Sequence, residues 1–85
     1  MNITPRRFVY VLESVSFPER HYVGLAADVS ERLNRHNKRL TLHTAKLAPW
    51  RVTVSIEFSE ERLAVSFERY LKTGSGRAFA KRHFR

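Results

Sequence analysis

The chain has no cysteine among its 85 residues and only 8 acidic residues against 16 lysines and arginines. Without cysteine it can form no disulfide, bind no zinc through thiolates and use no thiol nucleophile. No stretch approaches the roughly 20 apolar residues of a membrane span, and the apolar run at residues 8–12 is too short for the core of a signal peptide. The length predicts a single domain over residues 1–85, and we expect a cytoplasmic protein.

The excess of basic residues is the first indication of function. The formal net charge is +8 at pH 7. A basic domain attracts polyanions at long range, and nucleic acid is the commonest such partner. The alternative is that the charge only keeps a small protein soluble.

Three segments have the composition of strands. Residues 8–12 are β-branched or aromatic without polar alternation, which predicts a strand buried on both faces. Residues 14–19 contain a proline and predict a turn, so residues 21–25 should form the second strand of an antiparallel hairpin. Apolar and polar residues alternate over residues 51–58, which predicts a third strand.

A helix is expected after the hairpin. Asp28 is a good N-cap, and Glu31 stands three residues later, as in a capping box. Val29, Leu33 and Leu40 should lie along one face of this helix.

Two further helices are predicted in the last third of the chain. Ser59 is expected to cap the second helix and Gly74 to end it, and residues 76–83 should form the third. The order β-β-α-β-α-α predicts an α+β fold, a three-stranded antiparallel sheet flanked by about three helices. The apolar positions expected on the second helix are Leu63, Phe67, Tyr70 and Leu71.

Several residues in these elements could carry chemistry. Glu68 lies at the edge of the apolar face of the second helix, where a carboxylate needs a partner or a metal; the alternative is an ordinary solvated glutamate. Arg32 and His36 share a helix face and could bind phosphate and accept a proton, or could simply belong to an exposed basic face. Tyr10 and Tyr22 lie on the hairpin strands, where core packing is the common role of a tyrosine.

Read together, these residues resemble the GIY-YIG nuclease family, in particular the endonuclease module of the excinuclease UvrC. The first family tripeptide is matched by Phe-Val-Tyr at residues 8–10 and the second by Tyr-Val-Gly at residues 22–24. The family arginine is matched by Arg32 and the family glutamate by Glu68. The resemblance covers residues 7–84 and implies the same three-stranded fold.

The resemblance also implies a role for each matched residue. Glu68 would hold one divalent cation, Mg²⁺ or alternatively Mn²⁺. Arg32 would clamp the scissile phosphate, Tyr10 would activate or orient the attacking water, and Tyr22 would donate a hydrogen bond to the phosphate or the water. His36 would assist Tyr10. Because Arg32 and the metal should favour the phenolate of Tyr10, we expect activity to rise toward alkaline pH.

The resemblance implies a metal-dependent endonuclease acting on nucleic acid, more on DNA than on RNA, in repair or recombination. A homodimer or a targeting partner would supply the specificity. The basic residues expected to contact nucleic acid are Arg35, Arg39, Lys72, Arg77 and Lys81.

Three positions depart from the family pattern. Phe8 stands where the first tripeptide of the family begins with glycine. Leu25 stands where UvrC-type domains carry a lysine, and Ala80 stands where many active members carry an asparagine. The alternatives are therefore a catalytically weak nucleic-acid-binding module on the same fold, or an interaction domain of a larger complex.

Overall fold

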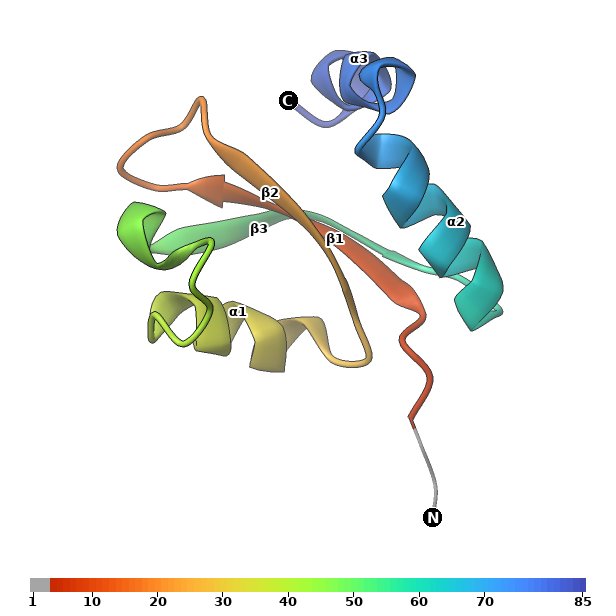
Figure 1. Cartoon of the computed structure of the whole chain (residues 1–85), viewed down its shortest axis with the longest axis horizontal. Helices are drawn as coiled ribbons and strands as arrows, with labels where there is room; N and C mark the ends of the chain where they lie inside the picture. The colour runs from red at the N-terminus through yellow and green to blue at the C-terminus, as the bar shows by residue number, and fades with distance from the viewer. Residues whose placement is uncertain (1–3) are drawn as a thin grey trace.

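The computed structural model describes residues 4–85, which form one sheet with a helix on one face and two helices on the other (Figure 1). The strands are antiparallel in the order β2-β1-β3. They are β1 (Phe8–Ser14), β2 (His21–Ala26) and β3 (Trp50–Glu57), and the helices are α1 (Val29–Asn37), the 3-10 helix η1 (Ala45–Leu47), α2 (Glu61–Leu71) and α3 (Gly74–His83). The predicted α+β class and the order β-β-α-β-α-α are confirmed.

The central strand β1 is buried on both sides, as its unbroken apolar composition predicts. Side chains alternate along it, so Tyr10 and Leu12 face α1, and Val9 faces α2 and α3. The core on the α1 side consists of Tyr10, Leu12, Ala26, Ala48 and Trp50. The core on the other side consists of Val9, Ala64, Leu71 and Ala80.

Helix α1 is shorter than its apolar pattern predicts. The side chain of Asp28 accepts a hydrogen bond of 3.0 Å from the Glu31 amide, which confirms the predicted N-cap. The helix ends at Asn37, and Arg39 adopts a left-handed φ of 61° that turns the chain away. Leu40 is therefore 61% exposed, and its predicted place on the apolar face is wrong.

The start of α2 and the depth of its apolar face also differ from the prediction. The helix is preceded by Glu60 rather than Ser59, with no side-chain cap hydrogen bond. Leu71 is buried, whereas Leu63 and Tyr70 lie at the margin of the face and are exposed. The face that α2 buries is thus narrower than the four apolar positions suggest.

Gly74 begins α3 instead of ending α2. Thr73 caps α3, since its hydroxyl accepts a 3.1 Å hydrogen bond from the Gly76 amide. A Cβ at Gly76 would overlap the Tyr70 carbonyl group, so the close approach of the two helices requires glycine there.

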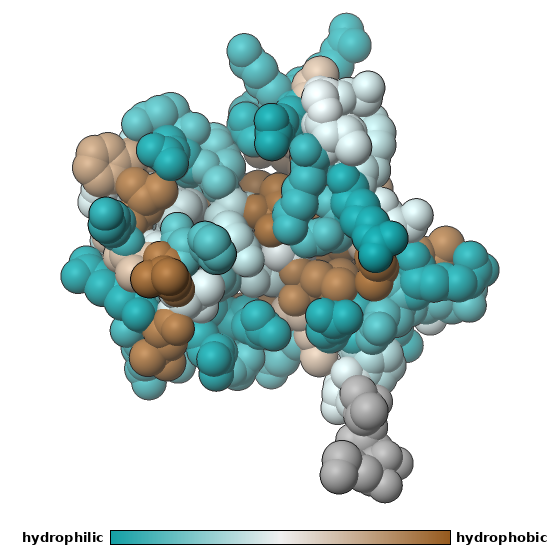
Figure 2. Space-filling model, viewed as in Figure 1, coloured by the Kyte–Doolittle hydropathy of each residue, from teal (hydrophilic) through white to brown (hydrophobic). Residues whose placement is uncertain are grey.

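The surface differs between the loop end of the molecule and α3. Hydrophilic (teal) and intermediate (white) residues lie over α3, at the top of Figure 2, whereas separate hydrophobic areas lie over the loop end at the left. Loop side chains that are exposed and apolar are Val15, Phe17, Leu40 and Leu42. Among residues 4–85, no helix combines the length and hydropathy that crossing a bilayer requires.

Candidate active site

Tyr10 is the central side chain of the candidate site. It is 1% exposed on β1, and its partner in the register of β2 is Gly24. A Cβ at Gly24 would overlap the phenol ring of Tyr10. The glycine that closes the Tyr-Val-Gly tripeptide is therefore needed because the ring passes over it.

His36 meets Tyr10 from the last turn of α1. Its Nε2 atom lies 2.9 Å from the Tyr10 hydroxyl, and the imidazole is 1% exposed. The alternative that His36 belongs to an exposed basic face is therefore wrong. Tyr22 packs against the same group, with ring centroids 4.9 Å from His36 and 6.3 Å from Tyr10.

Thr44 completes a chain of buried hydrogen bonds. Its Oγ1 lies 2.7 Å from Nδ1 of His36, and the residue is 1% exposed. Thr44 was not predicted from the sequence, because a threonine in the loop between α1 and β3 carries no motif. Its neighbourhood also depends on Trp50, whose indole donates a 2.9 Å hydrogen bond to the Thr44 carbonyl oxygen.

The pKa values of the two buried groups shift so that both stay neutral near pH 7. Burial, followed by the neighbouring Tyr22, raises the pKa of Tyr10 to about 12. Burial, followed by the charges of Arg32 and Arg35, lowers the pKa of His36. Arg32 does lower the pKa of Tyr10, but burial outweighs it. Arg32 thus favours the phenolate as expected, but in the protein alone burial sets the net direction and the pKa of Tyr10 is raised.

Arg32 and Glu68 bring the opposite charges of the site from the two sides of the sheet. Arg32 comes from α1 and is partly exposed, and Glu68 comes from α2. Both charges act on Tyr10, since Arg32 lowers and Glu68 raises its pKa. The fold therefore places the arginine and the glutamate within electrostatic reach of the same phenol group.

Glu68 is the candidate cation ligand. Its side chain is 16% exposed and forms an ion pair with Lys72, one helical turn away. The Oε2 atom of Glu68 lies 2.6 Å from Nζ of Lys72. Residues 4–85 contain no cluster of three or more histidine, aspartate or glutamate side chains that could enclose a metal. A divalent cation held by one carboxylate would complete its coordination with water and phosphate oxygens, and it would have to displace the ammonium group of Lys72 from Glu68.

The family model of the GIY-YIG catalytic domain matches residues 6–82. The chain belongs to this family. No curated protein and no solved structure gives a significant match. Membership in the GIY-YIG family implies nuclease activity in general, and with it binding to nucleic acid.

Two of the three departures from the GIY-YIG pattern, Leu25 and Ala80, lie in the apolar core between the sheet and α2–α3. Ala80 is 1% exposed and packs with Val9 and Leu71, and Leu25 packs at the margin of this core. Both residues therefore support packing in this chain.

The basic residues predicted to contact nucleic acid fall into two groups. Arg35 is exposed in the last turn of α1 and Arg39 is exposed just after its end, and Arg35 lies 3.9 Å from Glu31. Arg77 and Lys81 are exposed on α3, on the other side of the sheet, and Lys72 lies between α2 and α3 in an ion pair with Glu68. The GIY-YIG domain thus does not gather these five side chains into one patch.

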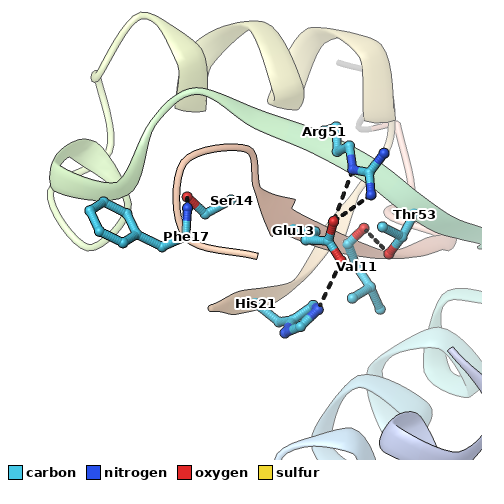
Figure 3. A network of polar contacts seen from close by, with 7 residues as sticks. All are labelled: Val11, Glu13, Ser14, Phe17, His21, Arg51 and Thr53. Carbon is cyan, nitrogen blue, oxygen red and sulfur yellow. Dashed lines mark hydrogen bonds and ion pairs between the residues drawn. The ribbon is translucent and has the colours of Figure 1, made fainter. Parts of the chain in front are cut away.

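A second polar network lies at the far end of β1, as Figure 3 shows. Glu13 stands between Arg51 of β3 and His21 of β2, with Arg51 Nε at 3.0 Å and His21 Nε2 at 3.4 Å. The hydrogen bond from Arg51 lowers the pKa of Glu13. These three residues join all three strands of the GIY-YIG sheet.

Proposed function

We propose that this GIY-YIG domain is a divalent-metal-dependent endonuclease that hydrolyses phosphodiester bonds in DNA. The observation that carries the proposal is the buried hydrogen bond of 2.9 Å between the Tyr10 hydroxyl and His36. It pairs a proton donor with an acceptor, beside Tyr22 and within reach of the charges of Arg32 and Glu68. A phosphodiesterase needs such a proton path together with charges that offset the transition state.

Tyr10 takes the proton of the attacking water in this proposal. A phenol with a pKa near 12 holds almost no phenolate at pH 7. Its proton must therefore leave as the water proton arrives, and the Nε2 atom of His36 is the acceptor at hand. The resulting imidazolium carries the proton, and the hydroxide attacks phosphorus.

Arg32 and Tyr22 bind the scissile phosphate in this proposal. Arg32 is the family arginine on α1, partly exposed beside the buried Tyr10–His36 pair. Its guanidinium can form two parallel hydrogen bonds to phosphate oxygens and offset the charge that develops there. The Tyr22 hydroxyl would add a hydrogen bond to the phosphate or to the water.

Glu68 would hold Mg²⁺ or Mn²⁺ in the loaded enzyme, in place of the ammonium group of Lys72. The metal would supply a positive charge that stabilises the scissile phosphate and its leaving oxygen. Lys72, once released from Glu68, would be free to contact a backbone phosphate. Its neighbours on α3 that would contact the same strand are Arg77 and Lys81.

A UvrC-like role in repair or recombination, alone or as a homodimer, completes the proposal. A catalytically weak binding module is the second candidate. It is favoured by the apolar side chains of Leu25 and Ala80, which leave two positions that are polar in many family members without a hydrogen-bonding group. Both candidates keep the basic surface, so only turnover distinguishes them.

The test is cleavage of labelled branched, nicked, single-stranded and duplex DNA, and of RNA, with Mg²⁺, with Mn²⁺ and with EDTA. Glu68→Gln should lower cleavage by more than about 100-fold, since it removes the carboxylate that holds the metal. The matched control is Glu57→Gln, because Glu57 is an exposed strand glutamate paired with Arg7. It should cut like the unaltered protein.

The substrate and the metal dependence decide between the candidates. Metal-dependent cutting that is lost in Glu68→Gln and kept in Glu57→Gln supports the endonuclease, and preference for DNA over RNA supports the substrate. Salt-sensitive binding by all three proteins without cutting by any would establish the binding module instead.

A further inference from the structure

We propose that Thr44 is a positioning residue that fixes the tautomer of His36, so that the unprotonated Nε2 atom of the imidazole faces Tyr10. The inference rests on the proposed function for its catalytic consequence. The tautomer itself follows from the buried hydrogen bonds alone and can be measured without cleavage.

The direction of each hydrogen bond around Thr44 follows from which atoms can donate a proton. The Thr44 hydroxyl lies 2.7 Å from Nδ1 of His36 and 3.3 Å from the carbonyl oxygen of Thr41. A carbonyl oxygen only accepts, so this contact uses the single hydroxyl proton of Thr44. The hydroxyl oxygen must then accept from His36, which places the imidazole proton on Nδ1.

The proton on Nδ1 determines the protonation of the other ring nitrogen, Nε2. A neutral imidazole carries one proton, so Nε2 is left with a lone pair. The Tyr10 hydroxyl, 2.9 Å away, then donates to Nε2. His36 and Thr44 are each 1% exposed, and the partner that the structure gives the buried Nδ1 atom is the Thr44 hydroxyl.

Thr44 is held in place independently of His36. Its amide donates to the Thr41 carbonyl oxygen at 3.2 Å, and its own carbonyl oxygen accepts from the Trp50 indole at 2.9 Å. Trp50 is 4% exposed in the core beneath α1. Because these contacts fix the loop on both sides of the hydroxyl, Thr44 orients His36 rather than following it.

The catalytic consequence concerns the path of one proton. When the attacking water gives a proton to Tyr10, the phenolic proton passes to Nε2 and no bond to Nδ1 breaks. The opposite tautomer would present an N–H group to Tyr10 and could accept nothing on that side. Loss of the Thr44 hydroxyl should therefore lower kcat and leave KM unchanged.

The experiment compares the full chain with Thr44→Val, which keeps the shape and removes the hydroxyl, and Thr44→Ser, which keeps the hydroxyl. Long-range ¹H–¹⁵N correlation spectra report which nitrogen of His36 carries the proton. We expect protonated Nδ1 in the unaltered protein and in Thr44→Ser, and a shift toward protonated Nε2 in Thr44→Val. The kcat for DNA cleavage should fall about 10- to 100-fold in Thr44→Val, as when a group that orients a reactive side chain is removed.

Thr53→Val is the matched control, because the Thr53 hydroxyl donates to the Val11 carbonyl oxygen away from the site. It should change neither the His36 spectrum nor kcat. Protonated Nε2 in the unaltered protein would overturn the proposal, and this measurement needs no variant to fold. An unchanged tautomer in Thr44→Val would overturn it as well. Absence of cleavage by the unaltered protein would count against the proposed function, whereas the spectra would still decide the tautomer.

Discussion

On the α1 face of the sheet, buried side chains carry hydroxyl and imidazole groups, whereas the core on the α2–α3 face is formed by buried aliphatic side chains with partly buried phenylalanines packed against them. Among the residues described, the buried polar side chains are Ser14, His36 and Thr44, and each has a hydrogen-bond partner on the α1 side. A buried polar group without a partner costs about 1–3 kcal/mol. The stability of the α1 face therefore depends on the pairing of its buried polar groups. The stability of the α2–α3 face depends on how completely its apolar side chains fill the core.

This difference indicates how so small a domain can bury a hydrogen-bonded tyrosine–histidine pair. The hydrophobic contacts of α2 and α3 with the sheet stabilise the fold whatever the protonation state of the site. The α1 face can then bury Tyr10 and His36, whose hydrogen bond of 2.9 Å makes up in part for their lost hydration. Substitutions on the two faces should consequently have different signatures.

The largest effect is expected on the α2–α3 face. Leu71 is 2% exposed in the core with Val9 and Ala80. Leu71→Ala should lower the free energy of unfolding by about 2–5 kcal/mol, because it leaves a cavity. Urea unfolding measures the loss. The His36 spectrum of the folded protein should stay unchanged, since no hydrogen bond of the α1 face is touched.

Leu42→Ala is the control for this prediction. Leu42 is 88% exposed in the loop after α1, so its truncation should change the free energy of unfolding by less than about 0.5 kcal/mol. A comparable loss in both variants, or a tautomer change in Leu71→Ala, would show that the two faces are not independent.

A smaller effect is expected where shape matters on the α1 face. Gly24→Ala places a methyl group against the Tyr10 ring, which should cost about 1–3 kcal/mol by overpacking. It should also shift the His36 spectrum, because the phenol moves off Nε2. Urea unfolding and the same spectra measure both changes.

Two comparisons sharpen the Gly24 prediction. Gly74→Ala is the matched control, since nothing lies within 4 Å of a Cβ at that position. Adding Gly24→Ala to Tyr10→Ala should cost far less than adding it to the unaltered protein, because the ring it would strike is gone. Equal costs in both backgrounds would mean that the Tyr10 ring is not the source of the strain.

The amino-acid sequence predicted the fold and the residues that match the family motif better than it predicted the environment of those residues. Period-two alternation in β3 and the Asp28 cap are local signals, and both predictions were confirmed. The end of α1 was not predictable, because Leu40 continues the apolar pattern and only the backbone turn at Arg39 removes it from the helix.

The environment of the candidate site depended on tertiary contacts. The roles of Tyr10, Arg32 and Glu68 remain predictions from the family motif. The burial of His36 and its contact with Thr44 arise where α1, its following loop and β1 meet, and no spacing in the sequence encodes that meeting. For the same reason the raised pKa of Tyr10 was missed, since burial outweighs the charges that the sequence does reveal.

The smallest expected effect is a change in the slope of stability against pH. Burial lowers the pKa of His36 below the 6.5 of an unfolded histidine. Below pH 6.5 His36 therefore becomes protonated in the unfolded chain while it stays neutral in the folded protein. The free energy of unfolding consequently falls as the pH falls toward the folded pKa of His36. The stabilisation that comes from neutral His36 is fully present above pH 6.5. The lowered pKa of Glu13 also stabilises the folded protein, and this stabilisation is lost only below about pH 4.5.

Titration of the His36 ring resonances measures this shift directly, and urea unfolding between pH 7 and 5 measures its consequence. Burial is the largest cause, followed by Arg32 and Arg35. Added salt screens exposed charges but not burial, so it should raise the pKa of His36 only slightly. A large rise would assign the shift to the two arginines, and the α1 face would then be governed by surface charge rather than by its buried pairing.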